Sequence, residues 1–251
     1  MPPRAPPALT VLSIEVVPFA GRETLKALVI NCSPRMERGN TALILNPFVQ
    51  GMRDSGAQTK VLHAKRLDIR PCTGEFRCWS DSPGSCYIKD DMADVLAEMR
   101  GADFWVFGVP VYAKIPGELQ NIFNRTMPLF NEDVVVRGRT LLPGIRAAMK
   151  VRRVVLVSSC AFWGLENFEL VVDLLEFLAK AFGTKLARPI LRPNADSLRS
   201  RAINRQTART IFDAARRAGS ELVTKGDITA RTARLVQMPL MSRDQFLKSQ
   251  A

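Results

Sequence analysis

The chain has 251 residues, and 47% of them are hydrophobic, which is enough to bury the core of one α/β domain with extensions. No stretch approaches the ~20 uninterrupted apolar residues that a membrane-spanning helix needs, so we expect no contact with a membrane. The net charge is +12, and from residue 184 to the end 14 Lys and Arg stand against 5 Asp and Glu. Such an imbalance can mark a nucleic-acid surface, but no helix-turn-helix or zinc-finger pattern accompanies it. We therefore do not expect nucleic acid as the main partner.

The five cysteines, without a secretory signal, are typical of a reducing compartment, and we expect a cytoplasmic protein. Residues 1–23 are expected to form a proline-rich N-terminal extension, in which residues 9–17 could add an edge strand or pack on a neighbouring subunit. Residues 24–225 should form one domain. Residues 226–251 should form a C-terminal tail, which could lie across another subunit.

Residues 25–30 form a short, mostly apolar run that predicts a buried strand, and a polar loop and a helix from Asn40 should follow it. Hydroxyl, amide and guanidinium groups of this loop would converge on the helix N-terminus, where unpaired N–H groups and the helix dipole favour an anion. Neither GxxxxGK[ST] nor GxGxxG is present, which leaves a monoester phosphate as the ligand. The alternative is an ordinary Ser-Pro turn and helix cap without a ligand. The candidate phosphate ligands are Ser33, Arg35, Asn40 and Thr41.

Four more apolar runs predict strands that alternate with helices, and the runs are 59–64, 103–109, 153–159 and 185–191. Pro47 should bend the first helix, because a mid-helix proline removes a hydrogen bond. Asp90 and Asp91 begin the second helix, and the helix dipole explains them as capping residues. His63, the only histidine, is expected to have a structural role. Residues 126–151 are expected to be irregular, as an excursion over the ligand or a subunit contact.

Three further loops contain chemically useful residues. Cys72, Cys78 and Cys86 lie in a loop rich in Gly, Ser and Asp, but gaps of five and seven residues do not fit structural zinc. A Pro-x-Tyr sequence directly follows the third strand, and a loop of small residues follows the fourth. Because ligands of open α/β sheets bind outside the carboxyl ends of the strands, the latter two loops should face the phosphate loop. The residues concerned are Pro110, Val111, Tyr112, Ser158, Ser159 and Gly164.

Together these motifs resemble those of the NADPH-dependent FMN reductase and iron–sulfur flavoprotein family. The run NCSPRMERGNT is similar to the phosphate loop of that family, with Cys32 where glycine is common. The Pro-x-Tyr sequence and the helix that ends in Asn124-Arg125 also match. The resemblance implies that residues 110–112 contact the flavin ring and that the small-residue loop contacts its edge. It covers roughly residues 25 to 225.

The cysteine loop departs from the family pattern at one position. The iron–sulfur members would have a cysteine at the place of Glu75, and a [4Fe–4S] cluster is normally held by four thiolates. Cys32 or Cys160 could replace the missing thiolate, but each lies at the end of another predicted strand. We therefore expect a relative that keeps the loop and has lost the cluster, with no metal site.

The fold implied by the resemblance is a flavodoxin-like, doubly wound α/β domain with a five-stranded parallel sheet in the order 2-1-3-4-5. The function implied is an FMN-dependent NAD(P)H oxidoreductase that passes electrons from NADPH or NADH to a quinone, flavin, nitro or azo acceptor, in a homodimer or homotetramer. No catalytic side chain is expected, because the flavin performs the chemistry. Two alternatives are an electron carrier with a protein redox partner and a basic module that binds nucleic acid or another anionic surface.

Overall fold

The structure is a computed structural model and describes residues 10–11, 24–112, 115–146, 149–200 and 203–249. Its centre is a parallel sheet in the strand order β3-β2-β4-β7-β8, with β9 also paired to β7. The predicted fold class and strand order are confirmed. The strands are β2 (Lys26–Asn31), β3 (Gln58–His63), β4 (Phe104–Pro110), β7 (Arg153–Ser159), β8 (Lys185–Leu186) and β9 (Ile190–Arg192).

The fifth predicted strand differs from the expectation, since it is divided into β8 and β9. Leu186 pairs with Val154, and Ile190 pairs with Val157, so four residues on this strand span three on its neighbour. Pro189 lies in the segment between β8 and β9, and because proline has no backbone N–H it cannot donate a hydrogen bond to the neighbouring strand. The edge of the sheet is therefore broken close to the carboxyl end of β7.

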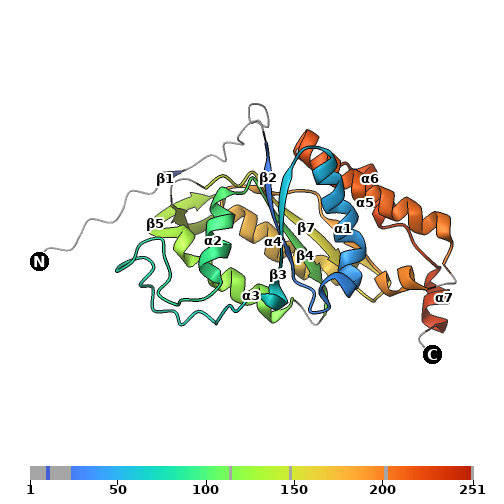
Figure 1. Ribbon diagram of the computed structural model, residues 1–251, viewed down its shortest axis with the longest axis horizontal. Helices are drawn as coiled ribbons and strands as arrows, with labels where there is room; N and C mark the ends of the chain where they lie inside the picture. Colours follow the sequence, from blue (N-terminus) through green and yellow to red (C-terminus); the bar gives the residue numbers. More distant parts are fainter. Residues whose placement is uncertain (1–9, 12–23, 113–114, 147–148, 201–202, 250–251) are drawn as a thin grey trace, which may run out of the picture.

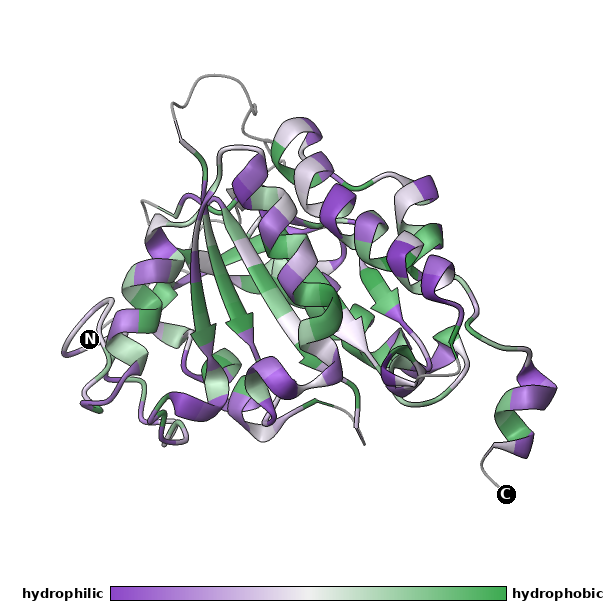
Figure 2. Ribbon diagram, turned by 45° about the vertical axis from the view of Figure 1, so that its right-hand side comes forward, coloured by the Kyte–Doolittle hydropathy of each residue, from purple (hydrophilic) through white to green (hydrophobic). Residues whose placement is uncertain are grey.

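Helices cover both faces of the sheet (Figure 1). Along β2, Leu28 and Ile30 pack into one core, and Ala27 and Val29 pack into the other, as the two-residue period of a strand requires. Figure 2 shows hydrophobic colour on the strands and inner helix faces and hydrophilic colour outside. One face carries α1 (Asn40–Asp54), α5 (Arg205–Lys225) and α6 (Ala230–Val236), and the other carries α2 (Met92–Gly101), α3 (Gly117–Asn124) and α4 (Glu169–Ala181).

Helices α1 and α5 touch backbone to backbone at two glycines. A Cβ atom on Gly51 would lie 1.8 Å from the carbonyl oxygen of Arg216, and one on Gly219 would lie 1.9 Å from the carbonyl oxygen of Phe48. Any larger residue at either position would force the helices apart. Helix α1 runs without interruption through Pro47, which removes one hydrogen bond of the helix. The contact with α5 therefore holds the helix that follows the predicted phosphate loop.

Most of residues 126–145 have regular structure, which corrects the sequence expectation that residues 126–151 are irregular. They contain an antiparallel hairpin of β5 (Phe130–Arg137) and β6 (Thr140–Ile145), and β1 (Thr10–Val11) pairs in parallel with β5. Gly138 makes the turn with φ +64°. The expected edge strand at residues 9–17 is described only at β1, and the rest lies outside the described residues.

The chain after residue 225 packs on the same core. Thr232, Ala233 and Val236 of α6 are buried against α5 and β9. Shorter elements complete the described chain: η1 (Met36–Arg38), η2 (Ala64–Arg66), η3 (Met127–Leu129), η4 (Leu165–Phe168), η5 (Ala195–Arg199) and α7 (Arg243–Lys248). Within the described residues, the helices are too short or too polar to cross a membrane.

Candidate functional site

A cleft with an empty volume of about 640 Å³ lies at the carboxyl ends of β2, β4 and β7. These strand ends are at the lower side of the sheet in Figure 1. The loops after these three strands meet there, although they are far apart in the sequence. Gly39, Cys160, Ala161 and Asp196 contribute to the wall of the cleft. Eight of the residues singled out from the sequence also line it: Ser33, Arg35, Asn40, Thr41, Pro110, Val111, Tyr112 and Ser159.

The loop between β2 and α1, residues 32–41, is ordered by its own hydrogen bonds and is called the phosphate loop below. The backbone N–H of Ser33 donates to Asn31 Oδ1 at 3.0 Å, and that of Arg35 donates to Ser33 Oγ at 3.3 Å. Ser33 is 2% exposed, whereas Arg35 is exposed at the cleft. The loop therefore places a fixed hydroxyl and a movable guanidinium at the same opening.

Gly39 lets this loop close on the start of α1. A Cβ atom at this position would lie 2.3 Å from Ser33 Oγ, which is closer than real Cβ contacts allow. The φ of Gly39 is −75°, so other residues could adopt the backbone conformation and the need for glycine is a matter of space. The first turn of α1 presents N–H groups that have no acceptor within the helix, next to the Ser33 hydroxyl.

Thr41 connects the phosphate loop to the loop after β7. Its Oγ1 lies 2.8 Å from Ser159 Oγ, and both residues are almost fully buried. The backbone N–H of Val111 donates to the carbonyl oxygen of Ser159 at 2.8 Å, which fastens the loop after β4 to the same point. Tyr112 follows with 57% of its surface exposed. The ends of three strands thus form one rigid wall with an aromatic ring beside it.

The side chain of Asn40 is held by residues that sequence reasoning did not single out. Its amide nitrogen donates to Asp196, and its Oδ1 accepts from Arg199 Nε at 2.7 Å. Arg199 Nη2 also donates to the carbonyl oxygens of Arg38 at 2.7 Å and Gly39 at 3.1 Å. Asp196 and Arg199 belong to η5, more than 150 residues away along the chain. No sequence pattern could have linked them to the loop.

Two predicted site residues do not line the cleft. Ser158 is fully buried and donates its hydroxyl to the carbonyl oxygen of Val109 at 2.7 Å, within the sheet. Gly164 lies against the side chain of Glu166, whose Oε1 is 1.8 Å from the position of a Cβ atom on the glycine. Gly164 borders a different cavity, which Arg192 and Leu240 also line. The structure therefore assigns Ser158 and Gly164 packing contacts.

The cysteine loop forms a second cavity, which we call the cysteine cavity and which has an empty volume of about 320 Å³. Its wall includes Cys72, Glu75, Cys78, Cys86 and Arg125. The wall thus has three thiols and one carboxylate, whereas a [4Fe–4S] cluster is normally held by four thiolates. Among the described residues, no group of His, Cys, Asp and Glu is arranged to hold a metal ion.

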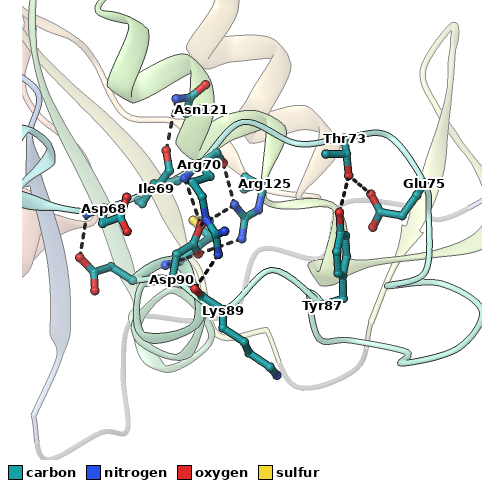
Figure 3. A network of polar contacts seen from close by, with 12 residues as sticks. Asp68, Ile69, Arg70, Thr73, Glu75, Tyr87, Lys89, Asp90, Asn121 and Arg125 are labelled. Carbon is teal, nitrogen blue, oxygen red and sulfur yellow. Dashed lines mark hydrogen bonds and ion pairs between the residues drawn. The ribbon is translucent and has the colours of Figure 1, made fainter.

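The carboxylate of Glu75 is held by hydrogen bonds at the wall of the cysteine cavity. Thr73 Oγ1 donates to its carboxylate and lies 3.0 Å from the hydroxyl oxygen of Tyr87 (Figure 3). The hydrogen bond from Thr73 is the main cause that lowers the pKa of Glu75. A hydrogen-bonded carboxylate at this position leaves three thiols without the fourth ligand.

A buried ion pair between Arg125 and Asp90 lies next to the cysteine loop. Arg125 donates from Nη1 and Nη2 to the two carboxylate oxygens of Asp90, at 2.8 and 2.9 Å, and Nη1 also donates to the carbonyl oxygen of Arg70 at 2.7 Å (Figure 3). Burial acts to raise the pKa of Asp90, but the Arg125 guanidinium and the N–H groups of Arg70 and Met92 hold it below its ordinary value. Asp90 Oδ1 also accepts from the backbone N–H of Met92 at 3.1 Å, so Asp90 caps α2 as expected and forms the ion pair in addition. The side chain of Asp91 does not cap the helix and instead accepts from the backbone N–H of Asp68 at 2.8 Å, which corrects the expectation for that residue.

His63 has the structural role that the sequence indicates. Its Nε2 lies 2.9 Å from Glu37 Oε1, and the ring packs at the end of β3, away from the described wall of the cleft. This contact places a histidine beside η1 of the phosphate loop. It gives no sign of a general acid or base in the cleft.

Comparison with protein families decides the relationship of the chain. Residues 25–174, which are 150 of the 251, match the model of the NADPH-dependent FMN reductase. The chain belongs to this family. The match includes the phosphate loop, the Pro-x-Tyr segment, the cysteine loop and the loop after β7, so the resemblance inferred from the motifs is confirmed.

Curated relatives of the chain are iron–sulfur flavoproteins. It is 28% identical over 127 residues to one from Archaeoglobus fulgidus, a match that covers 50% of this chain and 61% of that protein. It is 31% identical over 106 residues to one from Methanocaldococcus jannaschii, covering 42% of this chain and 53% of that protein. The chain thus spans between about half and three fifths of the length of these relatives.

Solved structures share the fold at low sequence identity. An NAD(P)H:quinone oxidoreductase from Methanothermobacter marburgensis superposes with a TM-score of 0.59 at 15% identity, over 79% of this chain and 97% of that chain. An FMN-dependent NADH-azoreductase from Bacillus anthracis, solved in complex with FMN, superposes with a TM-score of 0.58 at 10% identity, over 80% of this chain and all of that chain. These similarities confirm the flavodoxin-like architecture.

Proposed function

We propose that this protein binds FMN in the cleft and is an oxidoreductase that passes electrons from NADPH or NADH to a small-molecule acceptor. The observation that carries the proposal is the meeting of the phosphate loop with residues 110–112 and Ser159 in one cleft at the carboxyl ends of three parallel strands. Ligands of doubly wound sheets bind at this place. Membership of the FMN reductase family and an azoreductase neighbour with bound FMN support the choice of ligand.

The chain would hold FMN mainly by its phosphate. Ser33 Oγ, Thr41 and the N–H groups at the start of α1 would donate to a phosphate, and Arg35 would supply the positive charge, since its exposed side chain can reach into the opening. Residues 110–112 would lie along the flavin, with the exposed ring of Tyr112 free to cover it. Bound flavin supplies hydride acceptance and onward electron transfer, so no acid or base of the chain is required.

The acceptor we propose is a quinone, a free flavin, a nitro compound or an azo compound. Relatives of similar fold are named a quinone oxidoreductase and an azoreductase. Tyr112 lines the cleft and is 57% exposed, which fits the access that an exchange of nicotinamide and acceptor at one ring requires.

One spectrum tests the proposal. Purified protein, supplied with FMN and freed of excess by gel filtration, should keep the visible absorbance of oxidised flavin and lose it when NADPH or NADH is added without oxygen. Turnover should then follow addition of a quinone or azo dye. Protein that remains colourless after incubation with FMN would remove the proposal, and retained flavin that neither nicotinamide reduces would point to an electron carrier with a protein partner.

We propose further that the protein works as a homodimer or homotetramer in the cytoplasm. An apolar ridge on α4, formed by Leu170 and Phe177, is exposed, and Phe162 is exposed beside the start of η4. All five cysteines are free thiols, as in a reducing compartment. Light scattering after gel filtration should give a mass at least twice the 27.9 kDa of the chain, and a monomeric mass would contradict the oligomer.

A further inference from the structure

We propose that η5 is a second arm of the phosphate site, in which Arg199 is a positioning residue for the phosphate loop and Asp196 sets the charge of the cleft. The inference rests on the proposed function, because it concerns how strongly the site holds a phosphate monoester. It assigns roles to two residues that follow the last strand of the sheet, outside residues 25–174 that match the family model.

Arg199 fixes the loop through three hydrogen bonds. Its Nη2 donates to the carbonyl oxygens of Arg38 and Gly39, at 2.7 and 3.1 Å, and its Nε donates to Asn40 Oδ1 at 2.7 Å. A guanidinium on two carbonyl groups turns these peptide planes so that their oxygens face η5. The N–H of Asn40 shares a peptide plane with the Gly39 carbonyl and is therefore directed away from η5, at a residue that lines the cleft, whereas the N–H of Gly39 donates to the carbonyl oxygen of Met36 at 3.1 Å.

Asp196 acts on the same amide from the opposite end. Its Oδ1 accepts from the amide nitrogen of Asn40, so the two η5 residues hold both polar atoms of that side chain. Asp196 itself lines the cleft beside Asn40 and Thr41. A carboxylate there opposes a phosphate through like charge, although it orders the loop by its hydrogen bond.

The arm is attached firmly to the sheet. Backbone N–H groups of Asn194 and Ala195 donate to the carbonyl oxygens of Phe162 and Cys160, at 2.7 and 2.9 Å, in the loop after β7. Leu198 is buried in the core between α1, α5 and the sheet. Because the backbone of η5 is anchored in this way, loss of either exposed side chain should leave the fold in place.

The two η5 residues should affect the phosphate of FMN and not its ring system. The side-chain hydrogen bonds of Arg199 and Asp196 go to residues 38–40 of the phosphate loop, and within the described chain none of these bonds goes to residues 110–112. A change in the arm should therefore alter binding of FMN and leave binding of riboflavin, which has no phosphate, almost unchanged. A purely structural role would weaken both ligands together.

The experiment measures dissociation constants of FMN and riboflavin by quenching of flavin fluorescence at fixed ionic strength. Arg199→Ala should weaken FMN about tenfold, the loss expected for about one charge-assisted hydrogen bond, and change riboflavin less than about twofold. Asp196→Asn keeps an oxygen acceptor for Asn40 and removes the charge, so FMN should bind several-fold more tightly. Arg234→Ala, which removes an exposed arginine from α6, is the matched control and should change neither constant.

Equal losses of FMN and riboflavin affinity in Arg199→Ala, or no loss of either, would overturn the positioning role. Weaker FMN binding in Asp196→Asn would overturn the assignment of Asp196. If the wild-type protein binds neither flavin, the proposed function is wrong and the inference falls with it. If the wild type binds FMN and the variants behave like the control, only the inference fails.

Discussion

A single methyl group on Gly39 should weaken the cofactor site without unfolding the protein. In Gly39→Ala the new Cβ atom would lie 2.3 Å from Ser33 Oγ, 3.1 Å from Ser33 Cβ and 3.3 Å from the carbonyl oxygen of Met36. The φ and ψ of −75° and 157° are allowed for alanine, so the backbone need not change. The side chain of Ser33 must therefore rotate away.

The magnitude follows from the contacts that this rotation removes. The hydroxyl of Ser33 would leave both the N–H of Arg35, which donates to it at 3.3 Å, and the phosphate position in the cleft. A hydrogen bond to a charged group contributes about 1.5 to 3 kcal/mol. Loss of that bond to the phosphate corresponds to an FMN affinity roughly 10- to 150-fold lower.

The assay is a titration of apoprotein with FMN, together with thermal unfolding of the apoprotein to show that the variant is folded. Gly117→Ala is the control, because a Cβ atom on Gly117 meets nothing within 4 Å and alanine suits the start of a helix. Gly39→Ala that binds FMN as tightly as wild type would refute the idea that Ser33 Oγ contacts the phosphate.

Three further changes test other parts of the structure. Asp90→Asn should lower the free energy of unfolding by about 3 to 5 kcal/mol in urea, since it leaves the buried guanidinium of Arg125 unpaired. The pKa of Asp90 is lowered in the folded protein, so its carboxylate contributes to the free energy of unfolding above its unfolded pKa of about 3.9. That contribution is lost as the pH falls through the folded-state pKa. The stability of the wild type should therefore fall more steeply below about pH 4 than that of the variant. Glu75→Cys, treated with iron and sulfide without oxygen, should gain about four irons per chain and broad visible absorption, whereas equal iron in the wild type would contradict our interpretation of the cysteine cavity. Ellman's reagent should react fastest with the exposed Cys72, and the Cys72→Ala variant should lack this fast phase. Cys160 should react slowly, because burial raises the pKa of its thiol to about 11. Fast modification of Cys160 would show that the cleft opens more widely than the structure indicates.

The architecture was predictable from the sequence because parallel central strands are apolar on both faces. The runs that form β2, β4 and β7 are short and mostly apolar without interruption, and this pattern is typical of buried parallel strands. The hairpin of β5 and β6 was missed, although Val135 and Leu142 point inward while Val134 and Leu141 are exposed. Its charged residues and the Pro-Gly in β6 hid that alternation.

The candidate site was predictable at the level of loops and less so at the level of side chains. Ser158 and Ser159 are adjacent on a strand, so only one can face the cleft, and the sequence does not show which. The partners of Asp90 and Asn40 come from segments distant in the chain, Arg125 in one case and η5 in the other. Such pairings depend on the tertiary fold, and spacing along the chain carries no signal of them.

The close crossing of α1 and α5 has a practical consequence for anyone who shortens this protein. Gly51 and Gly219 leave no gap between the two helices, and one of them lies beyond residue 174, where the match to the family ends. A fragment cut at that boundary would lack the outer edge of the sheet and would expose the apolar flank of α1 to water. Such a fragment should aggregate, and truncations are better placed after α6.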